Sequence, residues 1–457
     1  MISKAVIKKL ISILGKKNIL TNKEDLLLYS HDATYQEFIP DVVVLPKDAE
    51  EVSRILQLAN EELFPVIPRG AGSGMSGGAL AVKGGLIMVM NRLNRILLID
   101  EDNLIAKVEP GVITAQLQEE VEKLGLFYPP DPASLDVSTI GGNVAECAGG
   151  PRALKYGVTR DYVLGLTVVL PTGEILDIGV ETVKGVVGYD LTRLIVGSEG
   201  TLAIVTGITL RLVPKPEMKK TMLVIFPDIL SAAQCVPRII KEKIIPTTIE
   251  FMDSLSVDCV RDQLPLELPE GELTMLLIEV DGNSVQIDKD IRKIEAICQQ
   301  MGITGLRLAR DNKEAEDLWK ARRNLSPSLQ KLKPHKINQD VVVPRSRLAE
   351  FITTLSDIGR RYNLFIPSFG HAGDGNIHVN IMLNRDNNDE VERANQALKE
   401  IMKLVVGLKG TISGEHGVGI SKKPYIGMEI STTGLELMSR IKKAFDPRGI
   451  LNPGKIF

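Results

Sequence analysis

The sequence predicts an α+β protein with more than one domain. Its 457 residues exceed the size at which a single hydrophobic core stops growing. Between Asp41 and Val213, short apolar runs that fit strands alternate with a helical period, which indicates α and β elements mixed in one region. Pro214 and Pro216 then end the last apolar run and favour an extended connector. We therefore place a first domain at residues 1–215 and begin a second at residue 216.

The elements follow from the spacing of apolar residues. Residues 1–17 have a helical period with lysines between the apolar positions, which predicts a packed surface helix, with a membrane-lying helix as the alternative. In the first domain we expect a helix at 49–63 and strands at 42–45, 65–68, 86–90, 163–170 and 208–213. In the second we expect a helix at 285–301 and strands at 222–226 and 273–280.

Charge and cysteine usage exclude several classes. A net charge of −3 and the lack of basic runs interleaved with aromatics argue against nucleic-acid binding. Cys147, Cys235, Cys259 and Cys298 form no CxxC, which argues against an iron–sulfur cluster or zinc ribbon held by this chain. No run approaches the roughly 20 apolar residues of a transmembrane segment. We expect a cytoplasmic protein with reduced thiols, and peripheral association with a membrane complex is the alternative.

Two glycine-framed segments predict a metal site. Residues 370–378 read GHAGDGNIH and residues 414–417 read GEHG, and together they hold three of the five histidines. Two histidines and a glutamate are the ligand set of a catalytic Zn²⁺ or similar ion that keeps an open position. A histidine pair alone would fit a polar turn, but the paired GEHG outweighs that alternative. If residues 377–383 form a strand, His378 and Asn380 share one face.

Three glycine-rich loops predict a site for an extended ligand. Residues 68–78, PRGAGSGMSGG, follow a short strand and offer backbone N–H groups to a pyrophosphate. Their GxGxxG is not a dinucleotide fingerprint, because residues 78–85 do not open a helix and no acidic residue stands at the ribose spacing. Residues 138–150 and 197–206 are further loops of this kind, so one ligand is expected to lie across all three.

Eight motifs in order carry a family resemblance. They are PRGAGSG, PPDPAS, STIGGNVAECAGG, YGVTRDYVLGL, GSEGTLAIVT, HAGDGNIHVN, SGEHGVG and FDPRGILNPGKIF. The chain from about Ser30 onward closely resembles the FAD-linked oxidoreductases of the vanillyl-alcohol-oxidase type, in the branch of D-lactate dehydrogenases and the glycolate oxidase flavin subunit. The resemblance implies a two-part FAD-binding domain at 1–215, an α+β substrate (cap) domain with the metal motif at 216–404, and a segment at 405–457 that returns to the FAD domain.

The resemblance also implies how FAD is held. Relatives with a covalently attached flavin carry a histidine in the first glycine loop. This chain has Ser73 there, so the flavin is expected to be bound without a covalent bond. The pyrophosphate is expected on residues 69–78, namely Arg69, Gly70, Ala71, Gly72, Ser73, Gly74, Gly77 and Gly78. Further contacts are expected from Pro130, Asp131, Ser134, Gly141, Gly142, Asn143, Gly149, Gly150, Tyr156, Glu199, Gly200, Ile204, Val205 and Asn452.

The family mechanism carries over to this chain residue by residue. It places His371, His378 and Glu415 on a divalent ion, Zn²⁺ by ligand type with Mn²⁺ or Fe²⁺ as alternatives. His416 is then the base that takes the substrate hydroxyl proton while hydride leaves for the flavin, and Asn380 offers a substrate-oriented amide. Arg322, which would otherwise be a solvated helix charge, matches the carboxylate-binding arginine.

The function expected is a metal-assisted, FAD-dependent dehydrogenase that oxidises a small D-2-hydroxy acid, D-lactate or glycolate. Asn338 stands where relatives acting on D-2-hydroxyglutarate are expected to carry lysine, although Lys336 is near. That diacid, a non-catalytic electron-relay subunit and a metal-dependent hydrolase remain as alternatives. The expected electron acceptor is a separate protein, an electron-transferring flavoprotein or an iron–sulfur subunit. Asp340 is left out of the catalytic residues, because an acid at a strand end is usually structural, with a role in orienting a ligand as the alternative.

Overall fold

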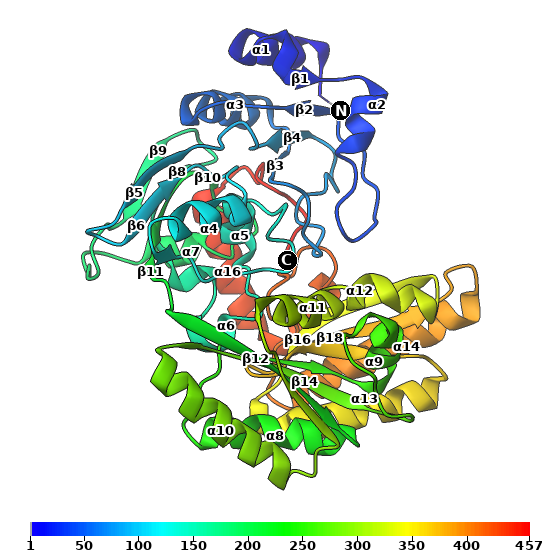
Figure 1. The fold of residues 1–457 in the computed structure, drawn as a ribbon. Helices are drawn as coiled ribbons and strands as arrows, with labels where there is room; N and C mark the ends of the chain where they lie inside the picture. The colour runs from blue at the N-terminus through cyan, green and yellow to red at the C-terminus, as the bar shows by residue number, and fades with distance from the viewer. Residues whose placement is uncertain (1) are drawn as a thin grey trace. The chain divides into compact units, whose positions relative to one another are not determined.

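The computed structural model describes residues 2–457, which form two compact units (Figure 1). Unit 1 comprises the chain up to Gly149, Val158–Lys215 and Glu415–Phe457, and unit 2 comprises Gly150–Gly157 and Pro216–Gly414. The second boundary lies later than the 404/405 expected from the sequence. The reason is the helix α14 (Asn388–Gly407), which buries Ile401, Met402 and Val405 and contacts strand β18 of unit 2.

Unit 1 contains two larger sheets. The four-stranded sheet has the order β1-β2-β4-β3, in which β4 is parallel to both β2 and β3. The five-stranded sheet is antiparallel and has the order β5-β6-β10-β8-β9. The strands are β1 (Ile19–Leu20), β2 (Val42–Val44), β3 (Val66–Arg69), β4 (Leu86–Val89), β5 (Ile96–Asp100), β6 (Ile105–Val108), β8 (Val163–Val169), β9 (Ile175–Gly179) and β10 (Ile204–Arg211), and β7 (Leu126–Phe127) pairs with β11 (Val213–Pro214).

The helices of unit 1 cover these sheets. The helix expected at the N-terminus is α1 (Lys4–Leu14), and its apolar face is buried in the same core as α3 (Ala49–Glu62), which makes it a packed helix. Val169 and Ile204 join that core, so the two sheets share it. The remaining helices are α2 (Lys23–Leu28), α4 (Thr114–Glu122), α5 (Ile140–Glu146), α7 (Leu191–Ile195), α15 (Ile426–Glu429) and α16 (Thr432–Phe445).

Unit 2 is built on one antiparallel seven-stranded sheet. Its order is β15-β12-β14-β13-β17-β18-β16, with helices on both faces (Figure 1). Met275 and Leu277 of β14 share a core with α9, α11 and α12, whereas α8 and α10 contact the same strand from the other side. The strands are β12 (Met218–Phe226), β13 (Thr248–Met252), β14 (Thr274–Gly282), β15 (Gly305–Leu308), β16 (His335–Val342), β17 (Ser368–His371) and β18 (Asn376–Leu383). The helices are α6 (Ala153–Tyr156), α8 (Ile229–Lys241), α9 (Ser254–Val260), α10 (Ser284–Gln300), α11 (Asn312–Arg323), α12 (Leu325–Ser328), α13 (Leu348–Tyr362) and α14.

These elements confirm the expected mixed α and β fold. Across residues 2–457, no helix combines the length and the apolar character needed to span a membrane.

The C-terminal tail lies within unit 1 and ties its loops together. The backbone of Val66 donates to Ile450 and accepts from Asn452, each at 2.8 Å, so the tail runs parallel to β3. The Asn452 amide donates to the carbonyls of Gly78 and Glu199, at 2.9 and 2.8 Å, and thereby joins the first and third glycine loops. Lys455 is 3% exposed, and its ammonium donates to the Leu80 carbonyl at 2.6 Å.

We expect Lys455 to make stability depend on pH. Burial lowers the pKa of Lys455 from 10.5 to about 8, against the attraction of Asp32 and Glu199. Between these two values the unfolded chain binds the proton and the folded chain does not, so this residue adds stability as the pH rises from 8 to 10.5. In Lys455→Met the free energy of unfolding, measured by denaturant titration, should lack that increase relative to the unsubstituted protein. Equal pH slopes for the two proteins would contradict the assignment.

Candidate active site

A cavity in unit 1 brings the three glycine loops together. Most of the residues expected to bind FAD line it: Arg69, Gly70, Ala71, Gly72, Ser73, Gly74, Gly78, Ser134, Gly141, Gly142, Asn143, Gly149, Glu199, Gly200, Ile204 and Val205. Glu415 and His416 also line this cavity. The sequence motifs, far apart along the chain, therefore form one wall.

Close approach explains why glycine occupies key positions of the wall. A Cβ at Gly70 would lie 2.4 Å from Oγ1 of Thr139, the hydroxyl that caps the N-terminus of α5 by accepting from the Gly142 N–H. Gly72 has φ +73°, and a Cβ there would lie 2.1 Å from Nη2 of Arg69. The first loop thus lies directly against the guanidinium.

Arg69 gives the cavity a buried cation. Its side chain comes from the end of β3, is 7% exposed, and lies 5.8 Å from the ring centre of Tyr29. Its Nη1 is buried and has no hydrogen-bond partner among the described residues. A guanidinium with an unused donor, beside backbone N–H groups uncovered by side chains, suits a diphosphate. The residues present therefore fit FAD.

Some residues expected to bind FAD lie outside this lining: Gly77, Pro130, Asp131, Gly150, Tyr156 and Asn452. Asn452 does not line the cavity but joins two of the loops that do. The Pro130 carbonyl accepts a hydrogen bond from the Gln118 amide at 2.7 Å. Gly150 and Tyr156 belong to unit 2, where the Tyr156 hydroxyl donates to Asp281 at 2.8 Å. A motif identifies a stretch of chain, but it does not tell which residues in that stretch turn toward the ligand.

Glu199 positions the segment that follows His416. It adopts φ +54°, and its carboxylate accepts from the N–H groups of Val418 at 2.7 Å and Gly419 at 2.6 Å. Burial raises the pKa of Glu199, and these two N–H groups oppose the rise. The third glycine loop therefore holds the GEHG segment in unit 1.

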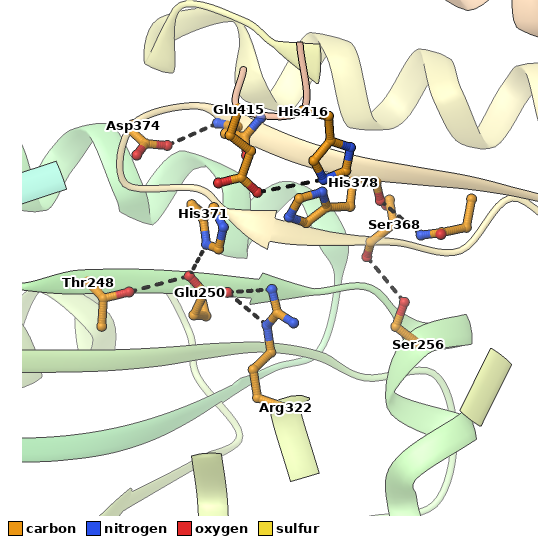
Figure 2. Close-up of polar contacts among 12 residues, drawn as sticks. Thr248, Glu250, Ser256, Arg322, Ser368, His371, Asp374, His378, Glu415 and His416 are labelled. Carbon is orange, nitrogen blue, oxygen red and sulfur yellow. Dashed lines mark hydrogen bonds and ion pairs between the residues drawn. The ribbon is translucent and has the colours of Figure 1, made fainter. Parts of the chain in front are cut away.

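One face of the sheet in unit 2 carries a polar cluster. The register pairs Glu250 with His371 and Phe369 with His378, and Asn338 with Asn380. Because strand side chains alternate, Glu250, His371 and His378 point to the same face (Figure 2). The two imidazole rings meet edge to face with centroids 5.2 Å apart.

Glu250 and Arg322 form a buried ion pair on that face. Glu250 is fully buried, and its Oε2 accepts from Nε and Nη2 of Arg322 at 2.7 and 2.5 Å. Burial acts to raise the pKa of Glu250, but Arg322 and His371 outweigh it and lower the pKa to about 2. Arg322 is only 9% exposed, so it is not a solvated helix charge. Its neighbour Arg323 is exposed and pairs with Glu316 instead.

Asn380 is fully buried and its amide bonds within the chain. Its Oδ1 accepts from the Asn338 amide at 2.7 Å, and its Nδ2 donates to the carbonyls of His378 and Pro367 at 3.2 and 3.4 Å. The sequence assigned this amide to the substrate. The structure gives it partners on β16 and β18 and in the segment before β17.

His371, His378 and Glu415 each offer a ligand atom, and these atoms all lie within 4.8 Å of one another. Both histidines lie on neighbouring strands, and Glu415 directly follows Gly414, whose N–H donates to Asp340 Oδ2 at 2.8 Å. Asp340 is fully buried, so it fixes the start of the GEHG turn on β16. Two imidazoles and a carboxylate at this spacing fit a divalent cation. His416 Nε2 lies 3.9 Å from Glu415 Oε1.

Glu250 is the residue that sequence reasoning missed. It is the one acid in the strand TIEFM, where every residue is buried. Buried charges are almost always paired, so a lone acid in an apolar strand was a signal for a buried cationic or metal-ligating partner.

We expect Gly72→Ala to weaken FAD binding. The added Cβ meets the Arg69 guanidinium at 2.1 Å and must displace it from the wall. FAD affinity, measured by fluorescence titration of the deflavinated protein, should fall at least about tenfold, or about 1.4 kcal/mol. Gly125→Ala is the matched control, because Gly125 has φ +71° but nothing within 4 Å of the added Cβ. Equal losses in both variants would mean that backbone strain alone is responsible.

Known sequence families match both parts of the chain. Residues 40–179 match the FAD binding domain family, and residues 215–456 match the family of FAD linked oxidases, C-terminal domain. The chain is 48% identical over 458 residues to glycolate oxidase subunit GlcD of Bacillus subtilis, covering 100% of this chain and 97% of that relative. It is 35% identical to D-lactate dehydrogenase of Anaerostipes hadrus, covering 97% of this chain and 95% of that one.

Solved structures agree on the fold. The crystal structure of p-cresol methylhydroxylase with substrate bound superposes with a TM-score of 0.80 at 18% identity, covering 100% of this chain and 97% of that chain. Alkyldihydroxyacetonephosphate synthase superposes with a TM-score of 0.78 at 19% identity, covering 99% and 85%. The cavity is lined by glycines and fits FAD, and both parts of the chain match FAD families. The chain therefore belongs to the FAD-linked oxidases and is an FAD-dependent oxidoreductase.

Proposed function

We propose that this protein is a metal-assisted dehydrogenase that oxidises a small D-2-hydroxy acid, D-lactate or glycolate, to the 2-oxo acid. The observation that carries the proposal is the donor set of His371, His378 and Glu415, in the same chain as the buried cation Arg322. Relatives named as glycolate oxidase subunit and D-lactate dehydrogenase match it over nearly the whole length. A metal-dependent hydrolase would leave the FAD binding domain unexplained.

Three sets of residues divide the chemistry. Arg69 and the glycine loops hold FAD, which when bound accepts the two electrons of the substrate. His371, His378 and Glu415 would hold the divalent ion, Zn²⁺ by ligand type with Mn²⁺ or Fe²⁺ as alternatives, and the ion would supply Lewis acidity toward the substrate hydroxyl. Arg322 binds the substrate carboxylate, because its guanidinium is buried and offers N–H groups that Glu250 does not use.

His416 is the proposed general base. It follows the ligand Glu415 directly and lines the cavity of unit 1. The Glu199 carboxylate accepts hydrogen bonds from the N–H groups of Val418 and Gly419, which lie two and three residues after His416. These bonds limit how far the imidazole of His416 can move. A neutral imidazole nitrogen at this place takes the proton of the substrate hydroxyl as the Cα hydrogen leaves.

A small acid is favoured over D-2-hydroxyglutarate. Asn338 is neutral, and its amide donates to Asn380 at 2.7 Å, so this position offers no charge to a second carboxylate. Lys336 lies two residues away on the same face of β16, and its ammonium donates to the backbone carbonyl and the hydroxyl of Ser326. Burial also lowers the pKa of Lys336.

We propose that the electrons leave through another protein. The four cysteines form no cluster motif, and the two family matches, at residues 40–179 and 215–456, are both to FAD families. An electron-transferring flavoprotein or an iron–sulfur subunit is the proposed acceptor. The Bacillus subtilis relative is named as a subunit, which supports a partner protein for that relative.

We expect one of the small acids to bleach the flavin in a metal-dependent way. The flavin-loaded protein would be titrated anaerobically with D-lactate, L-lactate, glycolate and D-2-hydroxyglutarate, with flavin absorbance followed before and after chelation and after addition of Zn²⁺. Bleaching by D-lactate or glycolate, abolished by the chelator and restored by Zn²⁺, is the expected result. Bleaching only by the diacid would reassign the substrate, and no bleaching by any of the four would favour an electron-relay subunit.

We expect His416→Gln to slow flavin reduction by about 10²- to 10⁴-fold, because a positioned general base contributes that much. The rate would be measured by anaerobic stopped flow, with FAD content and Zn²⁺ content determined on the same sample. His335→Gln is the matched control, since His335 lies at the start of β16 and its Nδ1 accepts only from the Arg385 N–H, at 3.3 Å. If the flavin of His416→Gln is reduced as fast as that of the unsubstituted protein, His416 is not the general base.

A further inference from the structure

Glu250 is a buried carboxylate to which no role in the reaction has yet been given. It lies in β13, between β14 and β17, and its side chain is fully buried. Taking a charge out of water costs free energy that an ion pair only partly offsets. A polar side chain without charge would disturb the core of unit 2 less. The partners of Glu250 therefore indicate what the charge does.

The first partner is His371. Its Nδ1 lies 2.5 Å from Glu250 Oε1, which also accepts from the Thr248 hydroxyl at 3.3 Å (Figure 2). A carboxylate offers acceptors only, so the hydrogen in the contact with His371 belongs to Nδ1. The neutral ring then carries its lone pair on Nε2, which is the form that ligates a metal ion.

The second partner is Arg322. Its Nε and Nη2 donate to Glu250 Oε2, and its guanidinium carbon lies 4.7 Å from the ring centre of Phe369. Glu250 thus binds the Nε and Nη2 edge of the planar guanidinium, and Phe369 packs against one of its faces. A substrate carboxylate is left with the end of the fork, formed by Nη1 and the second hydrogen of Nη2.

We propose that Glu250 is a positioning residue that orients the metal ligand His371 with one carboxylate oxygen and the substrate-binding Arg322 with the other. The inference rests on the proposed metal site and deepens it. One side chain sets the tautomer of a ligand and the direction of a cation, so metal affinity and carboxylate affinity depend on the same residue. Loss of its charge weakens both.

The test compares Glu250→Gln with a matched buried carboxylate. Glu279 lies one strand away on β14, is 4% exposed, and accepts from Trp319 of α11 at 3.0 Å and from the Thr221 hydroxyl at 2.7 Å. Glu279→Gln therefore removes a buried charge from the same face and disturbs α11 without touching His371 or Arg322. Both variants would be purified with FAD, stripped of metal and titrated with Zn²⁺ against a chromophoric chelator.

In Glu250→Gln the dissociation constant for Zn²⁺ should rise by about 10- to 100-fold, the usual effect of losing a partner of a metal-bound histidine. The KM for the acid that bleaches the flavin should rise as well, while FAD content stays as in Glu279→Gln. An unchanged Zn²⁺ affinity in Glu250→Gln would overturn the positioning role and leave the proposed function intact. Failure of the unsubstituted protein to bind Zn²⁺, Mn²⁺ or Fe²⁺ would overturn both.

A second measurement does not depend on a variant that folds. The chain has five histidines, so ¹⁵N-labelled imidazoles can be resolved and His371 identified by its absence in His371→Gln. In metal-free protein the ring of His371 should carry a proton on Nδ1. A ring with its proton on Nε2 alone would contradict the inference.

Discussion

The strand register of unit 2 is the constraint on which the candidate active site depends. Antiparallel pairing sets Glu250 opposite His371 and His378 opposite Phe369, and strand alternation brings these side chains to one face. A shift of one residue in β13 would turn Glu250 to the other face and leave Arg322 buried without a counter-charge. The ion pair and the register therefore support each other, and both position the side chains of His371 and His378.

Unit 1 differs from unit 2 in that its main-chain groups line a cavity for an extended ligand. Its three loops come from distant parts of the sequence, and two contacts fix them. Asn452 joins the first loop to the third, and Glu199 of the third loop holds the segment after His416. Glu415 and His416 belong to unit 1 and line the same cavity as the three loops.

The sequence predicted the parts of the protein that are local. Glycine loops, the helical period of α1 and α3, and the strand that sets His378 and Asn380 on one face all depend on residues near one another in the chain. Glu250 escaped because its partners Arg322 and His371 are 72 and 121 residues away, and no spacing rule reaches that far. Asp340 was expected to be structural, and its contact with Gly414, 74 residues on, fixes the start of the turn that carries Glu415. The second compact unit continues past the expected boundary near residue 404, because α14 runs to Gly407.

The backbone character of the flavin cradle also determines how the protein can change over time. Where recognition rests on N–H groups and on the lack of a Cβ, as at Gly70 and Gly72, a point substitution can abolish the fit but has few ways to adjust it. The polar face of unit 2 is built from side chains, such as Asn338 and Lys336, that differ in length and charge from their possible replacements. New substrates are therefore expected to arise through changes in unit 2, while the cofactor stays the same.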